Sequence, residues 1–257
     1  MRHSLADITL APGAARTENP LRLLVQRLVS RFALPPAAVD ALLDLRFSLR
    51  DHLPGQVLLH EGDKVRFCSF VATGFVTRYK LVGDGGRQIV AIHLSGDFVD
   101  LQHILLERAD HFVQALTPAS VVQFPAEALL ALAFRHPAIG HALWLESLIE
   151  AAIFREWVAN VGRRDARART AHLLCELATR REAAGLGSVG TFELPMTQEQ
   201  LGDALGLTSV HINRTLRTLG AEGLIRRSKR AVTVADWPGL QRVGDFNPNY
   251  LHLSDKG

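Results

Sequence analysis

The spacing of hydrophobic residues changes twice along this 257-residue chain. Between Pro20 and Leu49, apolar residues recur with helical spacing in two short segments separated by Leu34-Pro35-Pro36. From Leu53 to Phe124 the spacing falls to two residues, which is the period of a half-buried β-strand. Helical spacing returns from Ala126 onward. We therefore predict a β-rich region that is preceded and followed by helices.

Four short runs in the β-rich region have strand character and are bounded by turn residues. Gly83-Asp84-Gly85-Gly86 separates two of them, and glycine tolerates the positive φ of a hairpin turn. Many short strands with glycine-rich turns are typical of a β-sandwich or barrel. A segment that opens at Gly96 interrupts the pattern and predicts a short inserted helix. The four runs are QVLLHEGD, FCSFVATGFVTRYKLV, RQIVAIHLSGD and HFVQALTPASVVQF.

A long helical segment follows Pro137, and one apolar stripe on it has the 3.5-residue spacing of a coiled-coil seam. We predict that this stripe is the interface of a homodimer. Leu148 and Ile153 add apolar surface beside it, which would pack on the β-rich domain. The alternative is an ordinary amphipathic core helix. The predicted interface residues are Ala142, Leu145, Ile149 and Ala152.

The segment MTQEQLGDALGLTSVHINRTLRTLGAEGLI, residues 196–225, contains two helical patterns separated by a glycine. Gly202 lets a second helix approach closely, and Gly206 can adopt the left-handed conformation that ends the first helix. Thr197 and Thr208 suit the two helix N-termini. Together these features predict a helix-turn-helix. Its buried side would consist of Leu201, Leu205, Leu207, Ile212, Leu216 and Leu219.

Burial of that side leaves the opposite face of residues 209–219 exposed, on a helix of a width that fits the major groove of DNA. Arg214 suits guanine, Asn213 suits adenine or a phosphate, and Val210 suits a thymine methyl group. The start of the first helix and the basic turn 226–230 would contact phosphates. The predicted DNA-binding residues are Thr197, Gln198, Thr208, Ser209, Val210, His211, Asn213, Arg214, Arg217, Lys229 and Arg230.

Charge is distributed unevenly in a way that agrees with this prediction. Residues 162–230 contain 12 basic and 7 acidic side chains, a balance of +5. The remainder has 29 − 12 = 17 basic and 26 − 7 = 19 acidic residues, a balance of −2. A basic C-terminal segment on a slightly acidic body indicates a polyanionic partner, here double-stranded DNA. The alternative is a helical hairpin with a solvated face.

From about Leu45 to Trp237 the chain resembles the Crp/Fnr family of bacterial transcription regulators, most clearly in residues 195–225 and at Gly96-Asp97. The resemblance implies an α+β fold with an N-terminal double-stranded β-helix (jelly-roll) domain of the cyclic-nucleotide-binding type. A long dimerisation helix and a C-terminal winged helix-turn-helix domain would follow. It also implies a homodimer on a near-palindromic DNA site and contacts with RNA polymerase.

On this basis we expect five regions, with Asp165 as the N-cap of the first helix in the DNA-binding domain. They are a loose arm (1–20), a sensor domain with flanking helices (21–136), the long dimer helix (137–161), the winged helix-turn-helix domain (162–240) and a C-terminal tail (241–257).

Two departures from the family pattern affect the expected ligand and target. The Arg-Ser pair that holds the phosphate in cyclic-nucleotide-binding members falls near Ala109 and Asp110, and an acid is unfavourable beside a phosphate. A glutamate with which many members contact a base corresponds to Val210. We therefore expect a different target sequence, no certain cofactor, and a small-molecule effector, if any, other than cyclic AMP. A provisional ligand set is Gly96, Asp97, Asp100, Arg108 and Asp110.

Asp97, Asp100 and His103 recur at intervals of three residues, with His93 and His111 nearby. Imidazole and carboxylate groups are suitable metal ligands, so this set indicates either a metal or haem site or solvated residues on a surface helix.

The two cysteines, Cys68 and Cys175, are too few for a cysteine-based zinc or iron–sulfur cluster and fit a reducing cytoplasm. No apolar run has the length of a membrane span. No G-x-S-x-G or Walker motif occurs, so we expect a regulator and not an enzyme. A rival hypothesis is a ligand or metal sensor that acts on a protein partner through the winged helix.

Overall fold

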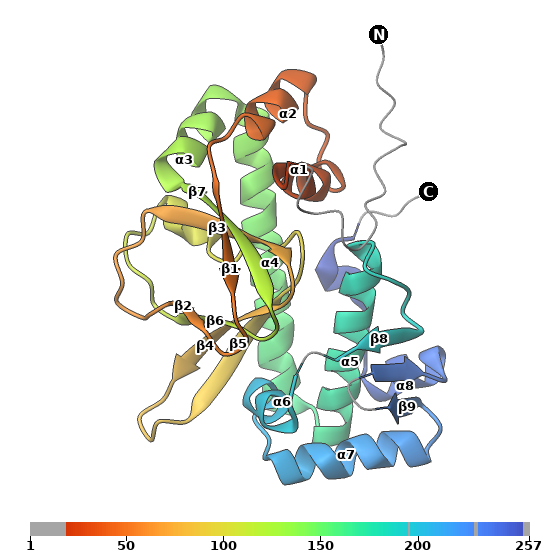
Figure 1. The fold of residues 1–257 in the computed structure, drawn as a ribbon. Helices are drawn as coiled ribbons and strands as arrows, with labels where there is room; N and C mark the ends of the chain where they lie inside the picture. Colours follow the sequence, from red (N-terminus) through yellow and green to blue (C-terminus); the bar gives the residue numbers. More distant parts are fainter. Residues whose placement is uncertain (1–18, 195, 229–230, 254–257) are drawn as a thin grey trace.

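The computed structural model describes residues 19–194, 196–228 and 231–253. The fold is mixed α+β, and Figure 1 shows its long helix α4 (Pro137–Arg163) as the axis of the molecule. The strands of residues 48–125, here called the β-roll, lie on one side of α4, and helix α5 (Ala166–Ala183) lies on the other. Residues 1–18 of the predicted arm (1–20) fall outside the described residues.

The β-roll consists of two antiparallel sheets, with strand orders β1-β7-β3 and β2-β6-β4-β5. Small apolar side chains such as Val71, Val113 and Val121 fill the space between them. All four predicted β runs contain strands. Strand β1 was missed because its residues are mostly exposed and show no alternation. The strands are β1 (Ser48–His52), β2 (Val57–Leu59), β3 (Phe67–Thr73), β4 (Val76–Leu81), β5 (Arg87–His93), β6 (Phe112–Ala115) and β7 (Ala119–Pro125).

The glycine-rich hairpin between β4 and β5 is confirmed, since Gly85 has φ +81° and the Val82 amide donates to the Gly86 carbonyl at 2.9 Å. The inserted helix is shorter than expected, a single 3₁₀ turn η2 (Leu101–Ile104). Side chains explain this: Asp97 accepts from the Leu94 amide and Asp100 from the Ser69 amide. Such bonds compete with helical ones.

The two expected N-terminal helices are α1 (Leu21–Val29) and α2 (Pro36–Leu43), and Pro36 occupies the first turn of α2, where proline is tolerated. With α3 (Ala126–Arg135) they pack on the upper part of α4 (Figure 1). Leucines of α1 and α3 meet Phe70 and Phe124 of the β-roll there. Cys68 and Cys175 are both buried free thiols.

The predicted dimer seam on α4 is wrong. Ala142, Ile149 and Ala152 are only 2%, 2% and 5% exposed, because they pack within their own chain, and Leu145 is half-buried. Leu148, expected to contact the β-rich domain, points outward instead. The helix has apolar residues on two sides, and a 3.5-residue period does not identify which side meets the chain's own domains.

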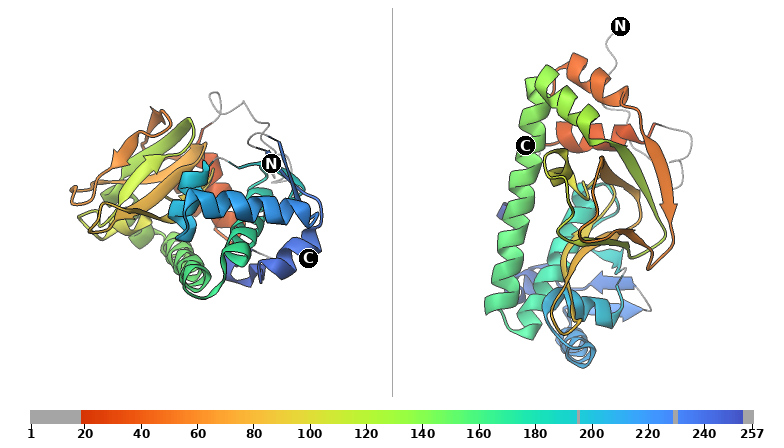
Figure 2. Two further views of the ribbon diagram at one scale, coloured as in Figure 1. Left: turned by 90° about the horizontal axis from the view of Figure 1, so that it is seen from below. Right: turned by 90° about the vertical axis from the view of Figure 1, so that its left-hand side faces the viewer.

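A second apolar stripe on α4 is exposed. Trp144, Leu148 and Val158 are 67%, 53% and 65% exposed, with half-buried Ala151 between them. Figure 2 shows α4 along the edge of the molecule, with the β-roll covering only one of its sides. No helix among the described residues is long and apolar enough to cross a membrane.

The C-terminal domain starts as expected, with the Asp165 carboxylate accepting from the Ala168 amide at 2.8 Å. Its small sheet has the order β8-β10-β9. The predicted C-terminal tail (241–257) continues the domain as far as the structure describes it: residues 241–243 are helical, and residues 244–253 pack back on α5 and α4. The elements are β8 (Thr191–Glu193), α6 (Gln198–Leu205), α7 (Ser209–Ala221), β9 (Ile225–Ser228), β10 (Ala231–Val234), α8 (Trp237–Val243) and η3 (Pro248–Leu251).

Candidate nucleic-acid interface

Both helices of the predicted helix-turn-helix are capped by the expected threonines. Thr197 forms a capping box with Gln200, in which each side chain accepts from the other residue's amide, at 3.1 Å and 2.9 Å. The Thr208 hydroxyl accepts from the His211 amide at 3.3 Å. These bonds satisfy amides that a helix N-terminus leaves unpaired.

The glycines have the predicted roles in the turn. Gly206 has φ +63°, the left-handed conformation that ends α6. A Cβ added to Gly202 would lie 2.3 Å from the Leu207 carbonyl oxygen, so only glycine lets the backbone of the turn come this close. The Leu207 amide donates to the Gly202 carbonyl at 3.0 Å, which holds the turn in place.

The predicted outer face of α7 is exposed, and its apolar face is buried against α5 and α6. Ile212, Leu216 and Leu219 are in the core, with Leu201 and Leu205 of α6, while Leu207 is half-buried. The exposed residues are Ser209, Val210, His211, Arg214 and Arg217.

Asn213 differs from its neighbours because it is half-buried. Its side-chain amide donates to the Gln198 side-chain oxygen at 3.1 Å, which ties α7 to the first turn of α6. This bond occupies the group that was expected to contact adenine or a phosphate. Asn213 therefore positions one helix on the other in this structure.

Sequence reasoning missed Arg169 on α5. Its guanidinium donates to the carbonyls of Leu205 at 3.0 Å and Arg164 at 2.7 Å. A cation at the C-terminus of α6 is favourable for the helix dipole. No local pattern reveals this role, because Leu205 is 36 residues away. Arg226 and Arg227 are exposed on β9, and Lys229 and Arg230 lie outside the described residues.

The helix-turn-helix is docked on the β-roll through α6, which contacts β5. Arg87 of β5 pairs with Asp203 at 2.6 Å, and the Gln88 side chain donates to the Ala204 carbonyl at 3.3 Å. Docking therefore leaves the outer face of α7 uncovered.

The five provisional ligand residues do not share a cavity. Asp97 lines a cavity between β5, α4 and α5, whereas Asp100 lines another inside the β-roll. Gly96, Arg108 and Asp110 line neither. Arg108 donates to the Gly62 carbonyl instead, and Asp110 bonds the ring of His111. The proposed set is therefore wrong as a single site.

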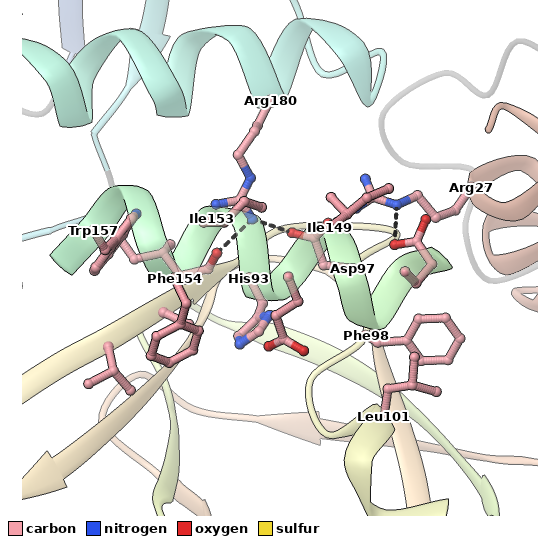
Figure 3. A pocket seen from close by; sticks show the side chains of 15 residues that line it. Arg27, His93, Asp97, Phe98, Leu101, Ile149, Ile153, Phe154, Trp157 and Arg180 are labelled. Carbon is pink, nitrogen blue, oxygen red and sulfur yellow. Dashed lines mark hydrogen bonds and ion pairs between the residues drawn. The ribbon is translucent and has the colours of Figure 1, made fainter. Parts of the chain in front are cut away.

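The Asp97 carboxylate is already occupied by cations from two other elements (Figure 3). Arg180 of α5 lies 2.7 Å from it and Arg27 of α1 lies 3.2 Å from it. Burial alone would raise the pKa of Asp97, but Arg180 and Arg27 outweigh it and lower the pKa to about 2. The surrounding cavity has a volume of only about 50 Å³. Asp97 thus joins the β-roll to α5 and to α1.

The cavity inside the β-roll has a volume of about 310 Å³, at the lower limit of the roughly 300–1,000 Å³ typical of ligand pockets. Asp100 lines it and accepts from the Ser69 amide at 2.6 Å and hydroxyl at 3.0 Å. Burial raises the pKa of Asp100 to about 6. Exposed Lys64 and Arg66 also line this cavity.

The histidines near Asp100 are buried, unlike the solvated residues expected on a surface helix. The rings of His103 and His111 stack with centroids 5.9 Å apart. Burial lowers the pKa of His111 to about 4, so the ring is neutral at pH 7. Within the described ranges, no three His, Cys, Asp or Glu side chains are placed to hold a metal ion.

Comparison with known proteins agrees with this geometry. Residues 168–243 match the Crp-like helix-turn-helix domain and residues 49–136 match the cyclic nucleotide-binding domain. The transcriptional activator protein FnrL of Cereibacter sphaeroides is 33% identical over 201 residues, covering 76% of this chain and 80% of FnrL. The chain belongs to the Crp/Fnr family of transcription regulators.

Two further members of the Crp/Fnr family illustrate the relationship. The nitrogen fixation regulation protein FixK of Azorhizobium caulinodans is 33% identical over 174 residues, covering 67% of this chain and 69% of that protein. The solved structure of FixK2 from Bradyrhizobium japonicum superposes with a TM-score of 0.72 at 26% identity, covering 77% of this chain and 98% of FixK2.

Replacing Gly202 with alanine tests the close approach in the turn. The new Cβ would meet the Leu207 carbonyl, so Gly202→Ala should destabilise the folded protein by about 1–3 kcal/mol in urea unfolding. Gly220→Ala on α7 is the matched control, because its Cβ would lie 3.8 Å from its nearest neighbour, the Ile225 carbonyl oxygen. The control should be neutral or slightly stabilising. Equal losses in both variants would contradict this account of Gly202.

Replacing Asp97 with asparagine tests the buried ion pair. The folded pKa of about 2 lies below the ordinary 3.8, so the ionised carboxylate stabilises the fold above pH 4 and this contribution is lost as pH falls toward 2. At about 1.4 kcal/mol per pKa unit, the contribution is roughly 2 kcal/mol at pH 7 and about half of that at pH 3.

Urea unfolding of wild type and Asp97→Asn at pH 7, 5 and 3 measures this difference. Asp40→Asn, at an exposed position of α2, is the control and should change little at any pH. A stability difference between wild type and Asp97→Asn that did not shrink below pH 4 would contradict an ionised Asp97.

Proposed function

We propose that this Crp/Fnr regulator binds a near-palindromic DNA site as a homodimer and that α7 of each copy contacts the bases. The observation that carries the proposal is the uncovered polar face of α7, which includes Arg214 and Arg217. A guanidinium bonds both major-groove acceptors of guanine, and discrimination by one such contact is worth about 1–3 kcal/mol. Ser209, Val210 and His211 lie on the same face.

Phosphate contacts would hold α7 in register. Thr197 and Gln198 lie at the start of α6, where unpaired amides favour an anion. Exposed Arg226 and Arg227 of β9 begin the basic turn 226–230. Lys229 and Arg230 complete this turn in the sequence. Asn213 acts through its bond to Gln198 by holding α6 and α7 at a constant angle.

The second copy would pack along the exposed stripe of α4. Trp144, Leu148, Ala151 and Val158 lie at seam positions of a coiled-coil heptad, and Arg155 occupies the seam position between Ala151 and Val158. Three large apolar side chains on one solvent-facing stripe are unfavourable in water. Pairing two α4 helices would place two α7 helices on half-sites about 34 Å apart.

The effector we propose is not a cyclic nucleotide held by its phosphate. The pKa of Asp110 is lowered, first by its hydrogen bond from His111, so an ionised and mostly exposed carboxylate stands where the family's phosphate contact is expected. The cavity inside the β-roll is the better candidate for a ligand, because of its volume. The name of FnrL, a transcriptional activator, supports a contact with RNA polymerase.

Arg214→Ala tests base contact. The substitution should weaken the binding free energy by about 1–3 kcal/mol for a duplex selected by the wild type and by much less for random duplexes. The reason is that one base contact is lost while the phosphate contacts remain. Fluorescence anisotropy at 150 mM salt measures both affinities. Arg50→Ala, at an exposed position of β1, is the control. If Arg214→Ala and wild type discriminate equally between the duplexes, Arg214 does not contact a base.

Leu148→Glu tests the interface. Two copies of a carboxylate would be buried in the seam without a partner, so the dimer dissociation constant should rise roughly 100-fold or more. Sedimentation equilibrium measures this change. Leu53→Glu is the control, because Leu53 is 74% exposed and lies beyond β1. A dimer that survives Leu148→Glu unchanged would place the interface elsewhere.

A further inference from the structure

The last described residues form a segment that the matched Crp-like helix-turn-helix region does not include. That region ends at residue 243, and residues 244–253, here called the strap, continue from α8. The 3₁₀ turn η3 in the strap contacts α5 and also α4. The strap therefore bridges the two helices that meet at residues 163–166, the junction between the long helix and the DNA-binding domain.

The path of the strap is closely determined by its surroundings. A Cβ on Gly244 would lie 2.7 Å from the His172 amide nitrogen and 2.9 Å from its Cα, so the strap backbone rests directly on the α5 backbone. Asp245 and His252 have φ +47° and +46°, the only non-glycine residues with positive φ among those described. Such conformations persist where surrounding contacts hold them.

Buried Glu176 of α5 is the point at which the strap, α4 and α5 converge. Its carboxylate is 0% exposed and accepts hydrogen bonds from Trp157 of α4 at 3.0 Å, Arg180 at 3.0 Å and the Tyr250 hydroxyl at 2.8 Å. A buried carboxylate is stable only with such donors. Each donor that Glu176 loses therefore weakens the contact between these elements.

Two further side chains, Arg180 and Arg164, connect the strap to the β-roll and to the residues on either side of the junction. Arg180 also binds Asp97, so only two side chains separate Tyr250 from the β-roll. On the other side of the junction, Arg164 pairs with Glu156 of α4 at 2.7 Å and with Asp245 of the strap at 3.0 Å. The strap is thus bound to the helix before the junction and to the helix after it.

We propose that the strap fixes the angle between α4 and α5, with Tyr250 and Glu176 as positioning residues for the recognition helix α7. The proposal rests on the homodimeric DNA binding proposed above. In a dimer, the angle at each junction determines the separation of the two α7 helices, and so the spacing of half-sites that both can occupy. The strap acts on this spacing and leaves the contacts of each α7 with its own half-site unchanged.

Tyr250→Phe tests the proposal with a minimal change. It removes the hydroxyl, which donates to Glu176 and also bonds His172 Nε2 at 3.1 Å, and keeps the ring, which stacks on His172 with centroids 5.8 Å apart. Tyr79→Phe is the matched control, since Tyr79 is the only other tyrosine and stacks on Phe112 in the β-roll. Glu176→Gln provides a second, nearly isosteric variant at the acceptor.

Each protein is used to select duplexes that carry two half-sites with a random number of base pairs between them. Wild type and Tyr79→Phe should enrich one narrow spacing. Tyr250→Phe should enrich a broader range of spacings with the same half-site sequence, and its affinity for the wild-type spacing should fall about tenfold, the effect of one hydrogen bond to a charged group. A merely structural role would lower the melting temperature without altering the preferred spacing.

An unchanged distribution of spacings and affinity in Tyr250→Phe would overturn the role of the strap. Amide hydrogen exchange at residues 162–168, measured without DNA, tests it separately from DNA binding. Exchange should be faster in Tyr250→Phe than in Tyr79→Phe, and equal rates would also overturn the proposal. Wild-type protein that enriches no duplex with two half-sites would contradict the proposed function, and the exchange result would still decide the role of the strap.

Discussion

The buried ion pair between Asp97 and Arg180 sets how the two domains of this regulator are placed. The two residues are 83 positions apart, one just after β5 and the other near the end of α5. Neither charge is stable alone in the interior, because the free energy lost with its hydration exceeds the free energy gained from contacts with neutral groups. Arg27 adds a second ion pair to Asp97, and Arg180 also donates a hydrogen bond to Glu176. Arrangements that separate the domains must therefore rehydrate these groups together.

The apolar contacts around this pair extend from one domain into the other. Ile89 and Ile92 of β5 belong to the same core as Leu201 and Leu205 of α6. Two surfaces remain uncovered by this packing, the polar face of α7 and the apolar stripe of α4. They differ in chemistry, one suited to bases and phosphates and the other to a second copy. Any change of conformation in the β-roll would reach α7 by shifting packed elements relative to each other.

Most of the features that were predicted correctly depend on contacts between residues that are close in sequence. The helix-turn-helix depends on contacts within about 25 residues, such as Thr197 with Gln200 and Gly202 with Leu207. The β4–β5 hairpin likewise depends on its own turn glycines. Strand β1 was missed because its side chains are mostly exposed, so no alternation of apolar residues marks it.

The residue pattern alone established the order of the main regions, the capped and glycine-dependent turn of the helix-turn-helix, and the polar face of α7. Tertiary structure decided which stripe of α4 is buried, why Asp97 is not free for a ligand, and where residues 244–253 dock. The reason is that a hydrophobic period shows which face of a helix is buried but does not show what buries it. The chain's own β-roll and a second copy would cover the same kind of apolar surface. A buried charge is equally hidden in the sequence, because Arg27, Asp97 and Arg180 resemble surface residues until the fold brings them together.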